Sequence, residues 1–458
     1  MTLGTILERK RSDVAQRMRE RPLDRLRAEL APSDRAFVAA LRRPHTGFVL
    51  EHKRASPSQG AIRLDLAPAL VARAYAPYAD AISVLTDEPF FDGRLEHLAA
   101  VRSAAPQPVL CKDFVIDPYQ VYEARRFGAD AILLMASVLD DPGLSACLQA
   151  TRELSMGALC EVHDEAELGR VLRLGGEVIG VNNRDLRTMR VDLTTSERLA
   201  PLVPQRCVRV CESGIESHAQ VRRLRDRFDA FLVGTSLMRA PELAAAVRAL
   251  VFGRVKVCGL RRTDQARAAL DAGASFGGLV LWDGSPRAID REAAAALRSV
   301  PLAWVGVFVD EAPERVAAIA HEVELAAVQL HGSEGRGYLE RLRAALPSGV
   351  AIWKAVRVGP ATTLPARDAI GADRLLLDTF VAGKPGGTGE RFDWRPLDAH
   401  HDRAELIVGG GLSPDNAAAA DALDVWALDV SSGVERAPGD KDPARLAAFF
   451  GALRGNLL

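Results

Sequence analysis

Short apolar runs alternate with amphipathic segments along most of the chain. Runs rich in Val, Ile, Leu and Ala recur at 47–53, 80–86, 107–112, 129–135, 157–162, 177–182, 207–212 and 230–235. The segments between them, such as 68–78, 119–127, 164–173 and 217–227, have the periodicity of helices. Parallel strands that are buried on both faces have this continuous apolar character. Eight strand–helix units in succession predict a closed (β/α)8 barrel, with an open doubly wound sheet as the alternative.

The pattern repeats from Arg254 onward. Further strands are predicted at 254–258, 276–281, 302–309, 325–331, 350–356, 373–378, 404–409 and 425–430, with helices such as 263–272 and 313–323 between them. We therefore predict an α/β protein of two tandem (β/α)8 TIM barrels, 1–252 and 253–458, each of the usual barrel size. Residues 240–252 predict a helix that joins the barrels rigidly, without a proline-rich linker. Residues 1–45 predict an N-terminal helical extension, broken at its prolines.

Composition narrows the function. Lys and Arg number 59 against 60 Asp and Glu, for a net charge of −1 without charge blocks, which argues against a nucleic-acid or membrane-surface partner. No run approaches the ~18 apolar residues of a membrane span. The amino-terminal segment lacks the apolar region of a signal peptide. Six cysteines without a CxxC pair indicate no disulfide framework, so we expect a cytoplasmic protein.

Polar residues stand at the carboxyl ends of the strands predicted in the first half. They are Glu51, Lys53, Lys112, Glu161, Asn182 and Ser213. Barrel chemistry takes place at this end of the strands. Any one of these residues has the alternative of lying in a solvated rim, but polar groups on five strands in one register favour a shared site. Lysines and carboxylates in one mouth shift each other's pKa values and supply acid and base together.

The strand ends of the second half carry another polar set: Cys258, Gln329, His331, Lys354 and Asp378. Period 2 puts Lys256 and Cys258 on one face of their strand, which suggests a thiol with a lowered pKa. A buried, inert cysteine is the alternative, and a mouth shared with Asp378 favours the reactive one. We expect His331 to pack or to hydrogen-bond, and the glycine-rich segment 383–389 to form a flap.

Glycines and hydroxyls follow the last two strands of each half. These are Ser213-Gly214 and Gly234-Thr235-Ser236 in the first, and Gly409-Gly410-Gly411 and Ser431-Ser432-Gly433 in the second. Backbone N–H groups at this place often bind a phosphate, although plain tight turns are the alternative. No metal-ligand spacing, P-loop or dinucleotide fingerprint is present, so no metal or cofactor is expected. The pattern favours acid–base rearrangement of a small phosphorylated substrate.

Longer motifs make a resemblance specific. In 50–58, 83–87, 111–114, 181–186 and 212–215 the first half resembles indole-3-glycerol phosphate synthase. In 256–260, 285–287, 328–332, 377–378 and 386–389 the second half resembles phosphoribosylanthranilate isomerase. The resemblance spans essentially the whole chain, in the order of the fused bifunctional enzymes of tryptophan biosynthesis. It implies a carbon–carbon lyase joined to an intramolecular oxidoreductase.

For the second half the resemblance implies an Amadori rearrangement of N-(5-phosphoribosyl)anthranilate to 1-(2-carboxyphenylamino)-1-deoxyribulose 5-phosphate. Asp378 would be the general acid that opens the ribose ring, and Cys258 the general base. Arg287 would bind the anthranilate carboxylate with its planar fork. Further substrate contacts are implied for Gly410, Gly411, Ser432 and Gly433.

For the first half the resemblance implies cyclisation and decarboxylation of that product to indole-3-glycerol phosphate. Lys112 would be the general acid and Glu161 the general base or proton relay, while Glu51, Lys53 and Asn182 position and polarise the substrate. How Glu51, Lys53 and Glu161 divide the dehydration stays open. The implied substrate-binding residues are Ser56, Phe91, Phe114, Arg184, Ser213, Gly214, Gly234 and Thr235. The two phenylalanines would line the anthranilate pocket, and the amino-terminal helices would cover this mouth.

Two other functions compete with this interpretation. The second barrel has the alternative of the analogous isomerisation in histidine biosynthesis, which usually uses two carboxylates, so that Cys258 with Asp378 argues against it. One barrel has the alternative of a silent scaffold, which intact proton-transfer residues in both halves disfavour. Gln59 and Thr235 depart from the residues usual in the synthase family without touching the acid–base groups. We expect a monomer that acts on small phosphorylated anthranilate–ribose substrates.

Overall fold

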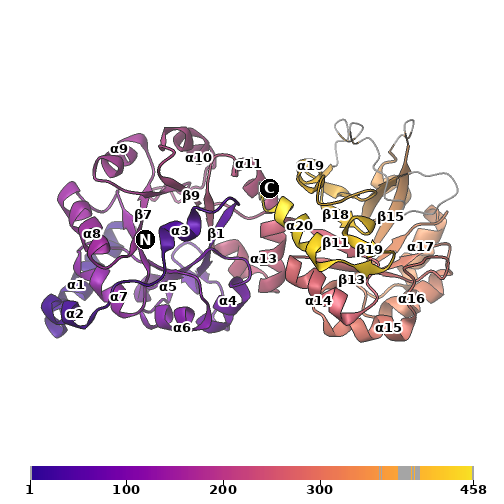
Figure 1. Cartoon of the computed structure of the whole chain (residues 1–458), viewed down its shortest axis with the longest axis horizontal. Helices are drawn as coiled ribbons and strands as arrows, with labels where there is room; N and C mark the ends of the chain where they lie inside the picture. The colour runs from indigo at the N-terminus through magenta and orange to yellow at the C-terminus, as the bar shows by residue number, and fades with distance from the viewer. Residues whose placement is uncertain are drawn as a thin grey trace. The chain divides into compact units, whose positions relative to one another are not determined.

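The computed structural model describes residues 3–359, 362, 364–379, 394, 397 and 403–455. The chain forms two compact units, Met1–Val251 and Phe252–Leu458. In each unit the helices surround a ring of strands (Figure 1). The segment 383–389, predicted as a flap, lies outside the described residues.

The first unit contains a closed barrel of parallel strands in the order β1-β10-β9-β8-β7-β6-β5-β4. Its strands are β1 (Gly47–His52), β4 (Ala81–Leu85), β5 (Val109–Lys112), β6 (Ala131–Met135), β7 (Gly157–Val162), β8 (Val178–Asn182), β9 (Val208–Glu212) and β10 (Ala230–Val233). The closed ring confirms the predicted barrel and excludes the doubly wound sheet. A short antiparallel pair, β2 (Ala55–Ser56) and β3 (Gly60–Ala61), follows β1.

Helices cover the outside of this barrel. They are α4 (Pro68–Tyr75), α5 (Glu88–Phe91), α6 (Glu96–Ala104), α7 (Tyr119–Arg126), α8 (Asp141–Glu153), α9 (Glu165–Arg173), α10 (Thr194–Leu199), α11 (His218–Leu224), α12 (Thr235–Arg239) and α13 (Leu243–Phe252), with a 3₁₀ turn η1 (Ala200–Leu202) after α10. Asp87, Asp140 and Asp164 accept hydrogen bonds from the first-turn N–H groups of α5, α8 and α9. These aspartates mark where the loops after β4, β6 and β7 turn into helix.

The amino-terminal extension forms α1 (Leu3–Glu20), α2 (Leu23–Glu29) and α3 (Phe37–Leu41). Phe37 and Leu41 of α3 are buried against the first residues of several strands, so α3 closes the amino-terminal end of the barrel. Helix α1 instead reaches the mouth, where Leu3 and Ile6 line the cavity. The expectation that the extension covers the mouth therefore holds for α1, whereas α3 packs at the opposite end.

A buried ion cluster fastens α1 to the barrel. The Nζ atom of Lys10 lies 2.7 Å from Oδ2 of Asp87 and 2.6 Å from Oδ1 of Asp113. The three side chains are 4%, 1% and 8% exposed, so the cluster is shielded from water. Asp87 follows β4 and Asp113 follows β5, next to Lys112. These ion pairs thus hold helix α1 against the barrel, and removal of Lys10 or of the two aspartates would leave buried charges without partners.

The second unit contains a second closed barrel, in the order β11-β12-β13-β14-β15-β16-β17-β18. Its strands are β11 (Val255–Cys258), β12 (Phe276–Val280), β13 (Ala303–Phe308), β14 (Ala327–Leu330), β15 (Ala351–Val358), β16 (Arg374–Thr379), β17 (Leu406–Val408) and β18 (Ala427–Val430). Its helices are α14 (Thr263–Ala272), α15 (Arg291–Ala296), α16 (Pro313–Glu322), α17 (Arg336–Ala345), α18 (Arg367–Ile370), α19 (Ala417–Asp421) and α20 (Pro443–Leu453), with 3₁₀ turns η2 (Leu297–Ser299), η4 (Arg403–Glu405) and η5 (Ser432–Val434). A hairpin of β19 (Glu435–Ala437) and β20 (Asp440–Lys441) precedes α20. The second predicted barrel is therefore confirmed as well.

Aromatic side chains fill part of the second barrel. Phe276, Trp353 and Trp426 pack together with ring centroids 5.3–5.6 Å apart.

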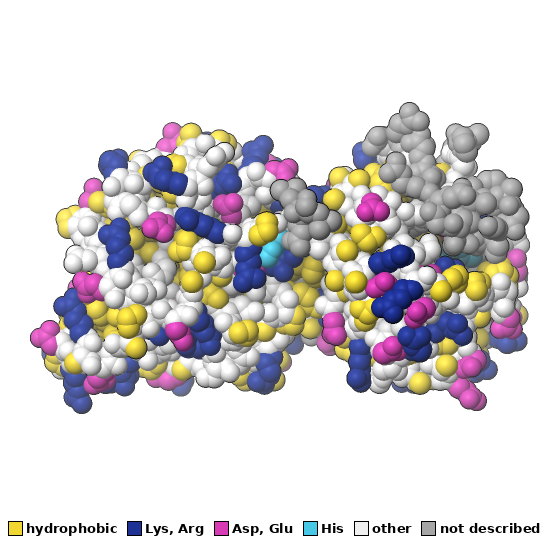
Figure 2. Space-filling view, in the orientation of Figure 1, with side chains coloured by type: hydrophobic (Ala, Val, Ile, Leu, Met, Phe, Trp, Pro, Cys, Tyr) yellow, Lys and Arg dark blue, Asp and Glu magenta, His cyan; other side chains and the backbone are white. Residues whose placement is uncertain are grey.

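In the view of Figure 2, basic and acidic side chains are interspersed over the described surface of each unit. Among the described residues, no helix is both long enough and apolar enough to span a membrane.

Candidate active sites

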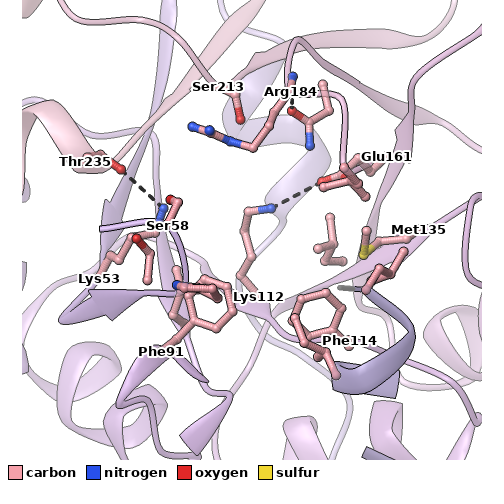
Figure 3. Close-up of a pocket in the computed structure, with 18 of the residues that line it drawn as sticks. Lys53, Ser58, Phe91, Lys112, Phe114, Met135, Glu161, Arg184, Ser213 and Thr235 are labelled. Carbon is pink, nitrogen blue, oxygen red and sulfur yellow. Dashed lines mark hydrogen bonds and ion pairs between the residues drawn. The ribbon is translucent and has the colours of Figure 1, made fainter. Parts of the chain in front are cut away.

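The mouth of the first barrel holds a cavity that brings together residues far apart in the sequence (Figure 3). Eleven of the residues predicted for this site line the cavity: Glu51, Lys53, Ser56, Phe91, Lys112, Phe114, Glu161, Asn182, Arg184, Ser213 and Thr235. Gly214 and Gly234 line an adjoining recess together with Ser213 and Thr235. All thirteen residues expected in the first site thus lie at this mouth.

Lys112 occupies the centre of the charged part of this cavity (Figure 3). Its Nζ atom lies 3.4 Å from Oε2 of Glu161 and 3.2 Å from Oε2 of Glu212. Lys53 lies 2.6 Å from Oε1 of Glu51, and its Nζ is 3.5 Å from the Thr235 hydroxyl. The three carboxylates are almost fully buried, so each requires a cation or a proton.

The surroundings shift the pKa values of the two carboxylates that contact Lys112 in opposite directions. Burial raises the pKa of Glu212 to about 7, because the charges of Glu161 and Glu51 add to burial and outweigh Lys112. Burial would also raise the pKa of Glu161, but Lys112, His163 and a hydrogen bond from Asn182 lower it. Near neutral pH, Glu161 is therefore ionised while Glu212 holds a proton part of the time. Paired carboxylates of opposite pKa shift are how a site supplies a base and an acid together.

Lys112 keeps its proton in this setting. Burial would lower its pKa, but the carboxylates of Glu212, Glu161 and Glu51 outweigh burial and raise it. The cavity therefore contains a fixed ammonium group that faces two acidic side chains. This is the arrangement expected of a hydrogen-bond donor to a developing oxyanion.

The rest of the cavity divides into an apolar side and a polar recess. Phe91 and Phe114 have ring centroids 6.0 Å apart and lie together with Leu133 and Met135. Lys53 and Arg184 line both the cavity and the recess that contains Gly214 and Gly234. Ser213 and Gly214 have positive φ values of 64° and 86°, so the backbone turns sharply at the recess. A flat apolar group and an anion would fit at opposite sides.

The mouth of the second barrel holds a separate cavity. Cys258 at the end of β11 and Asp378 near the end of β16 both line it, each 9% exposed. Arg287, Gly410, Gly411 and Ser432 also line it, as predicted, and so do Gln329 and His331. Gly433 is not among the described lining residues, and a Cβ atom added to it would overlap the carbonyl oxygen of Leu412. A side chain at Gly433 would collide with this backbone, so the position requires glycine, and its predicted contact with the substrate stays a prediction.

The acid–base groups of the second site have shifted pKa values. Burial raises the pKa of Asp378 to about 6, against a backbone hydrogen bond from Thr379 that lowers it. Burial also raises the pKa of the Cys258 thiol, although Lys256 lowers it. The expectation of a thiol pKa below its usual value is wrong, because the desolvation of Cys258 outweighs the charge of Lys256. Lys256 is itself bound by Asp429, at 2.9 Å.

His331 is neutral at this mouth. Burial lowers its pKa to about 3, and the charges of Lys256, Lys354 and Arg357 act in the same direction. Its imidazole contacts the side-chain amide of Gln329. This agrees with the prediction of a hydrogen-bonding residue and argues against a proton donor at neutral pH.

Two family models match the chain in succession. Residues 3–250 match indole-3-glycerol phosphate synthase, and residues 255–452 match N-(5'-phosphoribosyl)anthranilate isomerase. The tryptophan biosynthesis protein TrpCF of Vibrio parahaemolyticus is 47% identical over 457 residues, which cover 99% of this chain and 94% of that protein. The TrpCF proteins of Yersinia pestis and Salmonella typhi are 46% and 45% identical over 99% of this chain and over 94% and 99% of their own lengths. The chain belongs to the TrpCF family.

Membership of the TrpCF family confirms the predicted pair of activities. The first half is the synthase, a lyase, and the second half is the isomerase. The isomerase match argues against the alternative that the second barrel catalyses the analogous isomerisation of histidine biosynthesis. Because both halves match enzyme families, the alternative that one barrel is a silent scaffold is also disfavoured.

Glu212 lies in the motif 212–215, but no role in the first site is predicted for it from the sequence. This residue ends β9 at the level of Asn182 on the neighbouring strand, and its carboxylate contacts Lys112. A signal was available, because an acidic residue that directly follows the apolar run 207–211 is placed like Glu161 after its own run.

Replacement of Glu212 by glutamine should stabilise the folded first unit progressively as pH rises. In the folded chain Glu212 keeps its proton up to about pH 7, whereas its ordinary pKa is 4.5. The folded state therefore binds more protons between these values, so the contribution of Glu212 to stability falls from pH 5 to pH 8. Urea unfolding of wild type and Glu212→Gln at both pH values measures the difference. The exposed neighbour Glu216, changed to Gln, is the control. A wild-type-to-variant difference that does not change with pH would contradict the assignment.

Proposed function

We propose that Asp378 and Cys258 carry out the Amadori rearrangement in the second unit. Asp378 donates its proton to the ring oxygen of N-(5-phosphoribosyl)anthranilate as the bond from that oxygen to C1 breaks, which leaves an imine. The Cys258 thiolate then removes the proton from C2, and the resulting enol becomes the ketone of the product. The pKa of about 6 for Asp378 supports the first step, because a useful fraction is protonated near neutral pH. Lys256 beside Cys258 supports the second, because its charge favours the thiolate.

Arg287 binds the anthranilate carboxylate in this proposal. Glu435 accepts hydrogen bonds from Nε and Nη2 of Arg287 at 2.8–3.1 Å, and Lys441 holds Glu435 at 2.7 Å. A guanidinium has five N–H donors, so the Nη1–Nη2 edge is left for a ligand carboxylate. Glu435 therefore fixes which edge of Arg287 faces the cavity.

Replacement of Glu435 by glutamine should raise the KM of the isomerase by about tenfold with little change in kcat, because a charge-assisted contact that orients Arg287 is lost. Steady-state kinetics on N-(5-phosphoribosyl)anthranilate measure both constants. Asp440→Asn is the matched control, because Asp440 lies on the same hairpin and contacts Arg262 and Gln265 at its edge instead. An unchanged KM in Glu435→Gln would show that Arg287 needs no such orientation.

For the first unit we propose that Lys112 protonates the ribulose carbonyl oxygen while the aromatic carbon attacks the carbonyl carbon. Loss of carbon dioxide restores the aromatic ring, and loss of water completes the indole. Glu161 acts as the base, and Asn182, Glu51 and Lys53 position the intermediates. The observation that carries this assignment is the place of Lys112 between Glu161 and Glu212, two carboxylates with opposite pKa shifts.

The substrate poses follow from the division of the cavity. The anthranilate ring lies against Phe91 and Phe114, and the phosphate enters the recess near Lys53, Gly214 and Gly234. In the second unit the phosphate is placed near Gly410, Gly411 and Ser432. We further propose that the protein acts as a monomer in the cytoplasm and needs no cofactor. Its six free cysteines support a reducing compartment.

The test supplies N-(5-phosphoribosyl)anthranilate to the full chain and follows both the carboxyphenylamino-deoxyribulose phosphate and indole-3-glycerol phosphate over time. We expect the first compound to rise and then fall as the second accumulates. Accumulation of the first alone would contradict the role proposed for the first unit. Persistence of the starting compound would contradict the role of the second.

A further inference from the structure

His163 lies behind the first cavity and contacts Glu161. The residue directly follows β7 (Gly157–Val162), two positions after Glu161. Its Nε2 atom lies 3.5 Å from Oε1 of Glu161, while Oε2 of the same carboxylate faces Lys112 at 3.4 Å. His163 does not line the described cavity, although Glu161 does. The imidazole thus lies behind Glu161, outside the described lining of the cavity.

Glu167 holds the other side of this imidazole. Its Oε2 atom accepts a hydrogen bond from the backbone N–H of His163 at 2.7 Å and lies 3.1 Å from Nδ1 of the ring. Glu167 stands in the first turn of α9, where its own N–H is bound by Asp164 at 2.9 Å. Backbone and side chain of His163 are therefore both tied to a helix start, which fixes the ring orientation.

The two contacts determine where the protons lie. A neutral imidazole has one N–H and one lone pair. With Nδ1 donating to Glu167, a neutral ring would turn the lone pair of Nε2 toward the Glu161 carboxylate, which is repulsive. The imidazolium, with a proton on each nitrogen, removes this repulsion and places a positive charge 3.5 Å from Oε1 of Glu161. At this distance Nε2 and Oε1 interact by charge, and neither atom has a hydrogen-bond partner among the described residues.

We propose that His163, fixed by Glu167, is a positioning residue that holds Glu161 in its ionised form and aims its second oxygen at Lys112. This inference rests on the role of Glu161 as the base in the proposed function. It extends that function by a chain of three residues, Glu167, His163 and Glu161, that runs from helix α9 to the reacting groups.

The surrounding charges support the protonated imidazole. Burial would lower the pKa of His163, but its hydrogen bond to Glu167 and the charges of Glu161, Glu167 and Glu212 raise it. Glu161 is faced by Lys112 from β5, by His163 and by Glu212 from β9, and Asn182 donates a hydrogen bond to it. The Asn182 side chain is oriented by the backbone N–H of Arg184, which donates a hydrogen bond to Oδ1 of Asn182 at 2.9 Å. The imidazolium therefore supplies a cation on the Oε1 side of Glu161, whereas Lys112 lies on the Oε2 side.

The test compares pH profiles of the synthase reaction with purified 1-(2-carboxyphenylamino)-1-deoxyribulose 5-phosphate. In His163→Gln, loss of the imidazolium should move the acid limb of kcat upward by about one pH unit, equal to about tenfold in kcat on that limb. KM should change by less than about twofold, because His163 does not touch the substrate. Glu167→Gln should shift the limb in the same direction by less. Glu165→Gln is the matched control, because Glu165 lies in the same helical turn, is exposed and pairs with Arg198.

The proposal would be overturned if the acid limb of the kcat–pH profile stays in place in both His163→Gln and Glu167→Gln. A purely structural role would lower kcat equally at every pH without moving this limb. If His163→Gln does not fold, the Glu167→Gln profile decides alone. Glu161→Gln separates this inference from the function beneath it. Retained activity in Glu161→Gln would contradict the role of Glu161 as the base. If Glu161→Gln is inactive but the acid limb of the kcat–pH profile does not move in His163→Gln and Glu167→Gln, only the role of His163 is contradicted.

Discussion

Lys112→Ala is expected to lower kcat for indole-3-glycerol phosphate formation by about 10³-fold or more, within the range that general acids contribute. Lys112 is the cation that both Glu161 and Glu212 contact, and alanine removes the proton donor and leaves two acidic groups facing each other. Stopped assays with purified 1-(2-carboxyphenylamino)-1-deoxyribulose 5-phosphate measure the loss. The isomerase rate of the same protein should stay within about twofold of wild type, since its residues belong to a separate barrel.

Loss of a buried ion pair also affects stability, by about 3–5 kcal/mol when one partner is removed. Circular dichroism and a urea titration of Lys112→Ala therefore accompany the kinetics, and the rate is interpreted below the unfolding transition. Lys112→Arg keeps the charge with a different geometry and should recover stability more than activity. Substantial indole formation by folded Lys112→Ala would contradict the proposed general acid.

Cys258→Ala should lower kcat of the isomerase by about 10³-fold, because Cys258 is the only thiol among the described residues that line this mouth. The neighbouring His331 has a pKa lowered to about 3 and is held against Gln329, and the described lining offers Asp378 in the role of acid. Fluorescence of the anthranilate group follows the reaction. Indole formation from the supplied intermediate should be unaffected.

Cys160→Ala is the control for Cys258→Ala. Cys160 is a fully buried cysteine of β7 in the first unit and serves as packing. Its replacement should leave both rates within about twofold and cost stability through a small cavity. If Cys258→Ala, correctly folded, lost both activities, the two sites would not be independent.

The barrels can be predicted because each strand is a continuous apolar run, but the apolar pattern begins before the strand itself at several positions. Predicted strands began at or before Asp80 and Asp130, whereas β4 and β6 begin after them. Each of these aspartates accepts a hydrogen bond from the first backbone N–H groups of a neighbouring strand, Phe48 at 2.9 Å for Asp80 and Val109 at 3.0 Å for Asp130. Such a cap is a contact between strands, which a pattern along one strand does not contain.

The site residues of the first half could be named from strand ends and motifs, but their protonation could not. The direction of the Cys258 pKa shift depends on how deeply the thiol is buried. Lys256, two positions away in the sequence, suggests a shift in the opposite direction. Arg287 was assigned to a ligand carboxylate, while its partner Glu435 lies 148 positions away. Desolvation and long-range pairing arise only when the ring closes.

The Lys10 cluster has a consequence for how the first site is completed. Leu3 and Ile6 form part of the cavity wall, and Lys10 lies between the residues that follow two neighbouring strands. The barrel therefore uses the start of its own chain as an internal counter-ion, next to the lysine that does the chemistry. Any fusion partner or deletion at this end acts on the catalytic mouth itself, and a variant tagged there measures a different enzyme from one tagged at the other end.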